Sequence, residues 1–433
     1  MKRVLIYIYS VFINIISSEL LQSISVYTFF RLLNRTLPVI LLPFLTHYLT
    51  PKDYSIIDIF TNLVSIIIPL IGLNTVSSTS RYYFDKSILY KDYVSTVLIF
   101  NLITLLIFIP LSFLFNNLLF KFLNIQFVSF FLLYVVVFSF LEQNTTVYLT
   151  NLRLENKLLE YGLIGLIRTI IELFATLLLI IYFTQSWQGR IGGQFLGLLS
   201  ISIFSIYKLY NNGYFHMNFN FKYFKNALNY SLPLIVHTIT GILLGFTNRF
   251  FIIKFIGIKE AGIFASAYQL CFIISLFHTS FNEAWMPYLY KELTFNNSLK
   301  LKIKLTKITY LYTGFLIIIT FAVIKLVPFA YEIIGKSFRI DFNIVSWILI
   351  GFLFNGLYKM VVNYLFYYKK TKLIAIGTIF TFLFNLVLNY YFIKEWELLG
   401  AAIALCLTFF VHFLIFFFLS NKYFPLPWFY FFK

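Results

Sequence analysis

Apolar residues occur along this chain in blocks of about 20, and short polar turns separate one block from the next. A helix of about 20 apolar residues crosses about 30 Å of hydrocarbon, so each block predicts a membrane-spanning helix. The pattern predicts about twelve spans. Their expected bounds are 22–46, 54–77, 93–119, 124–149, 159–183, 190–210, 229–253, 260–285, 305–330, 343–368, 371–393 and 398–420.

Two stretches half a chain apart share one pattern, an apolar helix followed by a short polar turn and a second apolar helix. They are residues 25–60 and residues 230–270, and an offset of 207 positions lays Leu49 on Ile256 and Lys52 on Lys259. An internal repeat at half the chain length is typical of two-lobed membrane transporters. The matching stretches are short, and a chance match is the alternative interpretation.

The spans and the repeat predict five parts of the chain. Residues 4–16 are apolar but too short to span, and no small-residue cleavage site follows them, so we expect an interfacial segment or an upstream start codon rather than a removed signal. The parts are an N-terminal extension (1–17), an N-lobe of six spans (18–210), a cytoplasmic linker (211–228), a C-lobe of six spans (229–420) and an aromatic cytoplasmic tail (421–433).

Composition supports a membrane protein. The chain is 60% hydrophobic and only 12% charged, which leaves too little polar surface to cover a soluble core of 433 residues. A membrane β-barrel would show short alternating strands instead of long apolar blocks. The predicted fold class is therefore an all-α membrane protein with two six-helix lobes around a central cavity.

The distribution of charge predicts how the chain lies in the membrane. Of the Lys and Arg residues in loops and at span ends, 20 lie on the side of the N-terminus and 9 on the other side. Cytoplasmic loops carry the excess of Lys and Arg, so both termini are expected in the cytoplasm. Because these residues lie in short loops, the net charge of +18 does not indicate nucleic-acid binding.

The sequence offers no pattern for a metal, a cofactor or a catalytic domain. Cys271 and Cys406 lie in apolar spans, and His237, His278 and His412 are scattered without ligand spacing. The loops are too short to house a catalytic domain. We therefore expect neither an enzyme nor a bound cofactor.

Ionisable residues inside spans are the candidates for function, because each costs about 2.5–3.5 kcal/mol at mid-helix unless it has a partner or a water-filled cavity. Arg31 and Arg35 share one face of the first span beside Asn34. Arginine presents a planar fork to phosphate oxygens, which favours an anion-binding wall. The alternative is snorkelling, or pairing with a carboxylate such as Glu142.

Arg249 extends this interpretation into the second half of the chain. Under the offset it maps to Leu42, two turns beyond Arg35, so three arginines in one cavity would form a ladder for a lipid-linked anionic headgroup. The alternative is an interfacial arginine near the outer end of the seventh span.

Five further ionisable residues are candidates for lining the cavity or coupling to an ion. Arg168 and Glu172 are four apart on the fifth span and are expected to neutralise each other. Asp58, Glu142 and Lys359 could gate a cavity or carry a proton, although each is more often a satisfied structural group.

Several segments resemble one known family. The segments are FFRLLNRTLPVILLPFLTHYLTPKDYSIIDIF, GLNTVSSTSRYYFD (72–85), YSLPLIVHTITGILLGFTNRFFIIKFIGIKEAGIFASAYQL and FNEAWMPYLYKE (281–292). In order and spacing, over about residues 18–420, they resemble bacterial polysaccharide-biosynthesis flippases of the Wzx type. These belong to the multidrug/oligosaccharidyl-lipid/polysaccharide exporter superfamily.

The resemblance implies alternating access of two lobes around a cationic cavity in the bacterial inner membrane. The implied cargo is an undecaprenyl-diphosphate-linked oligosaccharide of O-antigen or capsule, moved from the cytoplasmic to the periplasmic leaflet by a monomer. A proton or sodium gradient, or a polysaccharide polymerase that consumes the product, would drive transport in one direction. Where the family often has an acidic residue before the seventh-span arginine, this chain has Asn248, so we expect Arg249 to be freer to meet an anion.

Three alternatives remain open. A drug or cation exporter of the same superfamily should have a carboxylate-rich cavity, whereas mid-span arginines prevail here. A membrane glycosyltransferase such as an O-antigen polymerase or ligase needs a large outer loop. A flippase for the peptidoglycan precursor would share the cavity physics and more often carries extra spans.

Overall fold

The computed structural model describes residues 30, 33–34, 41–83, 85, 87–123, 128–155, 157–184, 186–295, 298–368 and 370–429, which are helical almost throughout. The predicted extension 1–17, Arg31 and Arg35 lie outside the described residues. The elements are α3 (Leu42–Tyr48), α4 (Pro51–Ile67), η1 (Ile71–Asn74), α5 (Val76–Tyr82), α6 (Tyr90–Leu123), α7 (Phe131–Leu154), α8 (Leu158–Leu178), η2 (Leu179–Thr184), α9 (Trp187–Asn211), α10 (Phe221–Phe255), α11 (Ile258–Phe295), α12 (Leu299–Ile333), η3 (Lys336–Phe338), α13 (Phe342–Tyr367) and α14 (Thr371–Tyr423).

Within this described part, nine helices are long and apolar enough to cross a membrane. A tenth is added if α4 and the helical stretch after it, which are bent by 58°, count as one broken span. The 53-residue α14 covers the two predicted spans 371–393 and 398–420. Its backbone departs from helical geometry between them, at Trp396 and Glu397. The all-helical membrane fold is therefore confirmed, and the predicted count of twelve is consistent with it.

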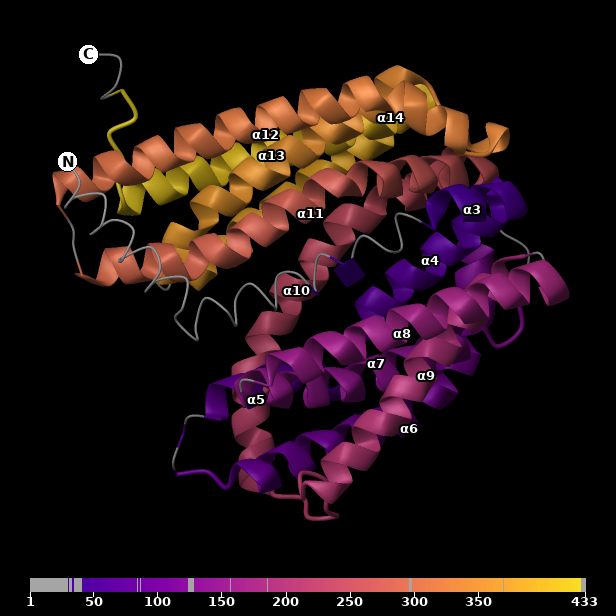
Figure 1. The fold of residues 1–433 in the computed structure, drawn as a ribbon, viewed down its shortest axis with the longest axis vertical. Helices are drawn as coiled ribbons and strands as arrows, with labels where there is room; N and C mark the ends of the chain where they lie inside the picture. Colours follow the sequence, from indigo (N-terminus) through magenta and orange to yellow (C-terminus); the bar gives the residue numbers. More distant parts are fainter. Residues whose placement is uncertain are drawn as a thin grey trace, which may run out of the picture.

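The helices form two bundles that meet where α4 packs against α10 and α11, and where α10 packs against η1, α5 and α6 (Figure 1). The first bundle packs α4 and α6 to α9 against one another, and the second packs α10 to α14. α4 also packs against α10 and α11 of the second bundle, and we call this contact the seam. At the seam Gly262 lies so close to α4 that a Cβ there would stand 1.7 Å from the Pro51 carbonyl oxygen.

The seam brings together the two halves of the predicted repeat. α4 begins at Pro51 and α11 begins at Ile258, which is the predicted offset of 207 positions. Each start has a local cause. Thr50 caps α4 in a reciprocal capping box with Asp53, and α11 follows Gly257, whose φ of 153° favours glycine.

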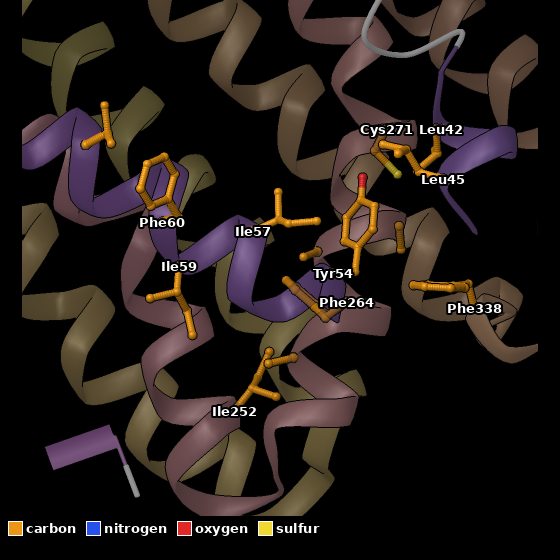
Figure 2. Close-up of a cluster of buried hydrophobic side chains, with 14 of the residues drawn as sticks. Leu42, Leu45, Tyr54, Ile57, Ile59, Phe60, Ile252, Phe264, Cys271 and Phe338 are labelled. Carbon is orange, nitrogen blue, oxygen red and sulfur yellow. The ribbon is translucent and has the colours of Figure 1, made fainter. Parts of the chain in front are cut away.

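Apolar side chains from both halves fill the seam (Figure 2). Tyr54 and Ile57 of α4 belong to one buried cluster with Phe264 of α11 and Ile252 of α10. Phe338 of η3 contacts the Tyr54 ring edge-on, with centroids 5.6 Å apart. Burial of this surface, at about 25 cal/mol per Å², is the non-specific part of what holds the bundles together.

A break follows α4 inside the first bundle. Gly72, Leu73 and Asn74 in η1 all have positive φ values, so the helix unwinds there before α5 begins. Side chains from neighbouring helices satisfy the freed backbone groups. The Gly72 N–H donates to Thr104 Oγ1 at 2.9 Å, and Gln143 Nε2 donates to the Ile71 carbonyl at 3.2 Å.

The segment between α9 and α10 is fastened to the first bundle. The Tyr214 hydroxyl donates to Glu155 at 2.7 Å, and His216 Nε2 lies 2.8 Å from Asp92 Oδ1. Burial opposes ionisation of Glu155, yet hydrogen bonds from Lys157 and Tyr214 hold the pKa of its carboxyl below the ordinary value. Residues 212–220 of the predicted linker are therefore packed along the first bundle, and residues 221–228 belong to α10.

Close approach of α8 and α9 depends on glycine. A Cβ on Gly193 would lie 2.3 Å from Thr176 Oγ1 and 2.5 Å from the Thr176 backbone nitrogen. The backbone of α8 cannot give way without moving the helix. Small residues are the usual means by which membrane helices approach this closely.

Gly193→Ala is therefore expected to destabilise the protein by about 1–3 kcal/mol, the usual range for overpacking. The matched control is Gly314→Ala in α12, where a new Cβ would meet nothing within 4 Å. Thermal unfolding of both variants in detergent, followed by intrinsic fluorescence, checks this. Equal melting temperatures for the two variants would contradict the packing described.

Candidate functional site

A cavity of about 370 Å³ lies beside the seam, between the two bundles. Its apolar lining comes from α3, α4 and α11. Its polar lining comes from Asn34 and from α4, α8, α9 and α11. The polar lining residues are Asn34, Tyr54, Asp58, Thr61, Glu172, Arg190, Gln194 and Gln269.

Asp58 of α4 forms an ion pair with Arg249 of α10 across the seam, with 3.2 Å between Oδ2 and Nε. The guanidinium has two more contacts, a 2.6 Å hydrogen bond from Nη1 to the Gly245 carbonyl and the ring face of Tyr268 at 3.9 Å. Its side chain is 4% exposed, whereas that of Asp58 is 20% exposed.

This pair corrects the expectation that Arg249 lacks a charge partner. The carboxylate that residue 248 does not provide comes from Asp58, 191 positions earlier in the chain. Asn248 instead donates from Nδ2 to the Ala401 carbonyl at 2.9 Å, so it faces α14 inside the second bundle. Arg249 is held in place by three groups, and Asp58 already balances its charge.

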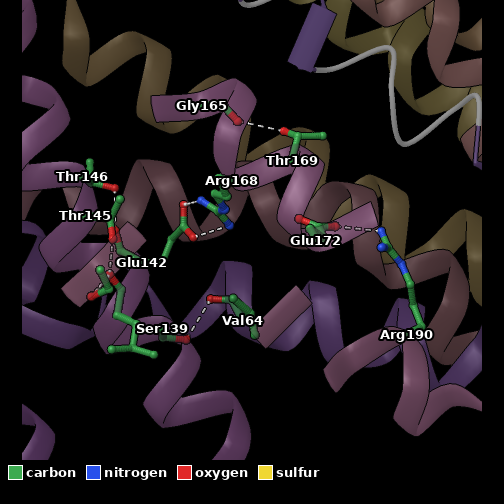
Figure 3. Close-up of polar contacts among 12 residues, drawn as sticks. Val64, Ser139, Glu142, Thr145, Thr146, Gly165, Arg168, Thr169, Glu172 and Arg190 are labelled. Carbon is green, nitrogen blue, oxygen red and sulfur yellow. Dashed lines mark hydrogen bonds and ion pairs between the residues drawn. The ribbon is translucent and has the colours of Figure 1, made fainter. Parts of the chain in front are cut away.

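Two further ion pairs lie within the first bundle (Figure 3). Arg168 of α8 contacts both oxygens of Glu142 on α7, at 3.0 and 2.8 Å. Glu172 of α8 contacts Arg190 of α9 at 3.0 Å, and Arg190 also donates to Thr176 at 3.1 Å.

The predicted pairing of Arg168 with Glu172 is therefore wrong. The two residues are one turn apart, as expected, but each finds a partner on a neighbouring helix. A bidentate contact of a planar guanidinium with a carboxylate is stronger than a flexible pair along one helix. Glu172 is also pressed against α9, because a Cβ on Gly197 would lie 2.9 Å from the Glu172 Cβ.

Arg190 is the cavity residue that sequence reasoning misplaced. It stands at the first position of the predicted span 190–210 and was not among the candidate residues, yet it lies in the first turn of α9 and is 6% exposed. A signal was present, since Gly189, Gly193 and Gly197 recur every fourth position around it. Such spacing lines one face of a helix for close packing, which places the intervening arginine in a packed span.

A second polar contact crosses the seam one turn from Asp58. The Tyr54 hydroxyl donates to Gln269 Oε1, joining α4 to α11. Both residues line the cavity. Neither was predicted, because an uncharged tyrosine or glutamine in an apolar span was not counted among the ionisable candidates.

Lys359 lies apart from this cavity. It belongs to α13 in the second bundle, where its Nζ donates to Thr279 at 2.7 Å. Nearby, Asn363 donates to Asn282, also at 2.7 Å. The structure thus brings Asp58, Glu172 and Arg190 together around the cavity, and Arg249 is paired with Asp58. It does not bring Lys359 to them.

The polar side chains on the described wall of the cavity are balanced in charge, and apolar side chains line the rest of it. Asp58 and Glu172 each face an arginine, and the remaining polar side chains are amides and hydroxyls. Amides and hydroxyls both donate and accept hydrogen bonds, so such a wall suits a hydrated ligand rich in hydroxyl groups.

Comparison with known families decides the class of protein. Residues 20–292 match the family described as polysaccharide biosynthesis protein. The chain belongs to this family. The match begins before the first described helix and runs through α11, so it includes the whole seam and the cavity.

Two relatives from Haemophilus influenzae are similar over most of their length. A protein of the Lsg locus is 25% identical over 363 residues, which cover 81% of this chain and 85% of that protein. An uncharacterised membrane protein is 25% identical over 372 residues, covering 82% and 86%.

Solved transporters share the fold. An inward-facing MATE-family multidrug resistance transporter of the MOP superfamily has a TM-score of 0.72 at 15% identity, covering 90% of this chain and 94% of that one. The lipid II flippase MurJ in an inward closed conformation has a TM-score of 0.68 at 19% identity, covering 92% and 88%. The family member described here therefore has the fold of these transporters.

The buried Glu172–Arg190 pair predicts a strong mutational coupling. Arg190→Met or Glu172→Gln alone leaves one charge without its partner and should lower thermal stability markedly, whereas the double variant should recover part of the loss. The expected coupling is about 1–3 kcal/mol, measured as melting temperatures in detergent.

The exposed pair Lys304–Glu292 provides the control. Its side chains are 52% and 28% exposed, so Glu292→Gln should change stability by less than about 1 kcal/mol. Additive effects in the Glu172–Arg190 cycle would show that the two charges do not depend on each other.

Proposed function

We propose that this protein moves an undecaprenyl-diphosphate-linked oligosaccharide from the cytoplasmic to the periplasmic leaflet of the bacterial inner membrane. The observation that carries the proposal is the polar, charge-balanced cavity at the meeting of the two bundles. Membership of a polysaccharide biosynthesis family supports it, and so does the fold shared with a lipid II flippase. Family and neighbours are transporters, which favours translocation without bond making.

In this proposal each part of the cargo meets a different environment. The oligosaccharide occupies the cavity, where amides and hydroxyls such as Gln194, Thr61 and Gln269 replace hydrogen bonds to water. The diphosphate meets Arg31 and Arg35 of the first span, because a planar guanidinium suits the oxygens of a phosphate. The prenyl tail remains in lipid, where its hydrocarbon needs no partner.

Arg249 takes a different role from the one its position in the sequence suggested. Because Asp58 neutralises it, its first contribution is to fix the seam rather than to bind phosphate. The proposed anion-binding ladder is thereby reduced to Arg31 and Arg35. The two bundles would alternate between openings on either side, with both termini in the cytoplasm as the positive loops predict.

A second candidate is a multidrug or cation exporter. It is favoured by the likeness to MATE transporters and by the two carboxylates, Asp58 and Glu172, on the cavity wall. Both carboxylates already face an arginine, which weakens their attraction for a cationic drug. Efflux of ethidium from cells that express the protein separates this candidate from a flippase.

Arg35→Ala is expected to abolish surface polysaccharide in the native host when it replaces the chromosomal copy, and Arg35→Lys is expected to restore part of it. A point charge retains attraction to the diphosphate, but it loses the bidentate contact. Polymer is measured on gels with a glycan stain, and lipid-linked precursor by extraction. The lipid-linked precursor is expected to accumulate in the Arg35→Ala variant.

Arg81→Ala is the matched control, since Arg81 is an exposed arginine in the last turn of α5. It should leave the polymer unchanged at equal protein levels. Normal polymer in the Arg35→Ala variant would remove the first-span arginine from the proposed diphosphate site. Ethidium efflux with normal polymer in a strain lacking the whole protein would favour the exporter.

A further inference from the structure

We propose that the Asp58–Arg249 pair is a releasable lock on the seam, and that proton binding to Asp58 from the cavity releases it. This rests on the proposed function, because a lock has a purpose only in a protein whose bundles separate. The ligand assigned to the site is a proton, and the part that moves is α4 relative to α10 and α11.

The position of the pair is the first reason. Among the ion pairs that the described residues form with one another, Asp58–Arg249 is the one that joins the two bundles. Those of Arg168 and Arg190 stay within the first bundle, and that of Lys304 stays within the second. Breaking Asp58–Arg249 therefore affects the contact between bundles, whereas breaking the others affects a bundle's interior.

The unequal surroundings of the two charges are the second reason. Arg249 keeps the Gly245 carbonyl and the Tyr268 ring when Asp58 withdraws, and both belong to its own side of the seam. Asp58 is 20% exposed and lines the cavity, so a proton in the cavity water reaches it directly. Neutralising Asp58 thus opens the contact without leaving a guanidinium bare in an apolar interior.

After release, the seam keeps its apolar burial, which is not directional, and two contacts between uncharged groups. Tyr54 and Gln269 share a neutral hydrogen bond, which contributes about 0.5–1.5 kcal/mol net. Gly262 and Pro51 meet through backbone atoms, so that contact has no charge to hold it. The ion pair is the strongest single directional contact that the described residues make across the seam.

The break after α4 supplies a pivot. η1 is unwound and the helices on its two sides are bent by 58°, so α4 can change its angle to α5 while its contacts with α7 and α9 adjust. Its freed backbone groups bond to Thr104 and Gln143 of the same bundle, and a tilt of α4 need not break these bonds.

Other titratable groups face Asp58 and must be separated from it in a test. Tyr54 lies one turn away on α4, Arg249 and Tyr268 approach from α10 and α11, and Glu172 and Arg190 line the same cavity. Glu142 on α7, which packs against α4, is paired with Arg168. Of the carboxyls in this group, Asp58 is the one whose partner lies in the other bundle.

The experiment measures the separation of the bundles directly. Lys52 at the start of α4 and Lys259 at the start of α11 are exposed and differ by the repeat offset. Spin labels are placed on K52C and K259C in a C271A/C406A background. Their distance distribution is measured by pulsed electron resonance in lipid nanodiscs at about pH 8 and about pH 5.

The lock predicts a short distance at the higher pH and a longer population that grows about fivefold or more at the lower pH. Asp58→Asn, which imitates the protonated acid, should show the longer population at both pH values. The double variant Asp58→Asn/Arg249→Gln should do the same. The double variant leaves no charge without its partner, so it can be measured in place of Asp58→Asn if that single variant does not fold.

Glu142→Gln is the matched control, because it neutralises a carboxylate that is paired within one bundle. It should respond to pH like the unsubstituted protein. The proposal is overturned if Asp58→Asn stays closed, if Glu142→Gln opens equally, or if Asp58→Asn keeps the full pH response. No cargo is needed, so these outcomes are independent of whether Arg35 binds a diphosphate.

Discussion

Charge in an apolar slab must be neutralised, and this constraint organises the described structure. Asp58, Glu142 and Glu172 each find an arginine on another helix, and in each case the helices approach closely enough to bring the groups within about 3 Å. For Glu172 the approach depends on Gly193 and Gly197, since larger residues would push α9 off α8. Small residues and buried charges are therefore parts of one arrangement.

The sequence predicted the elements well, because apolar periodicity is a local property. Spans, turns and the repeat offset follow from residues within about 20 positions of one another. The start of α11 lies 207 positions after that of α4, as the alignment of the two halves required. The break at η1 was harder, since the stretch after Ile71 reads simply as the end of a span.

The candidate site was predicted less well, because partners across helices are not a local property. Helical spacing placed Arg168 and Glu172 on one face but could not say which neighbour each would meet. The missing acid at residue 248 was replaced from α4, far away in sequence. The mid-span arginines and the family resemblance predicted a cationic cavity, whereas the described wall is balanced in charge. Arg31 and Arg35, on which a cationic surface would depend, lie outside the described residues.

The distance in sequence between Asp58 and Arg249 also matters while the chain is being made. The two residues are 191 positions apart, and synthesis proceeds at about 5–20 residues per second, so Asp58 emerges about 10–40 s before its partner. During that interval the first bundle must enter the membrane with this carboxyl unmatched. If the carboxyl is protonated, or lies near the lipid headgroups, it avoids the free-energy cost of placing a charge in hydrocarbon. Completion of the second half then fixes the first, which couples assembly of the two bundles to their order of synthesis.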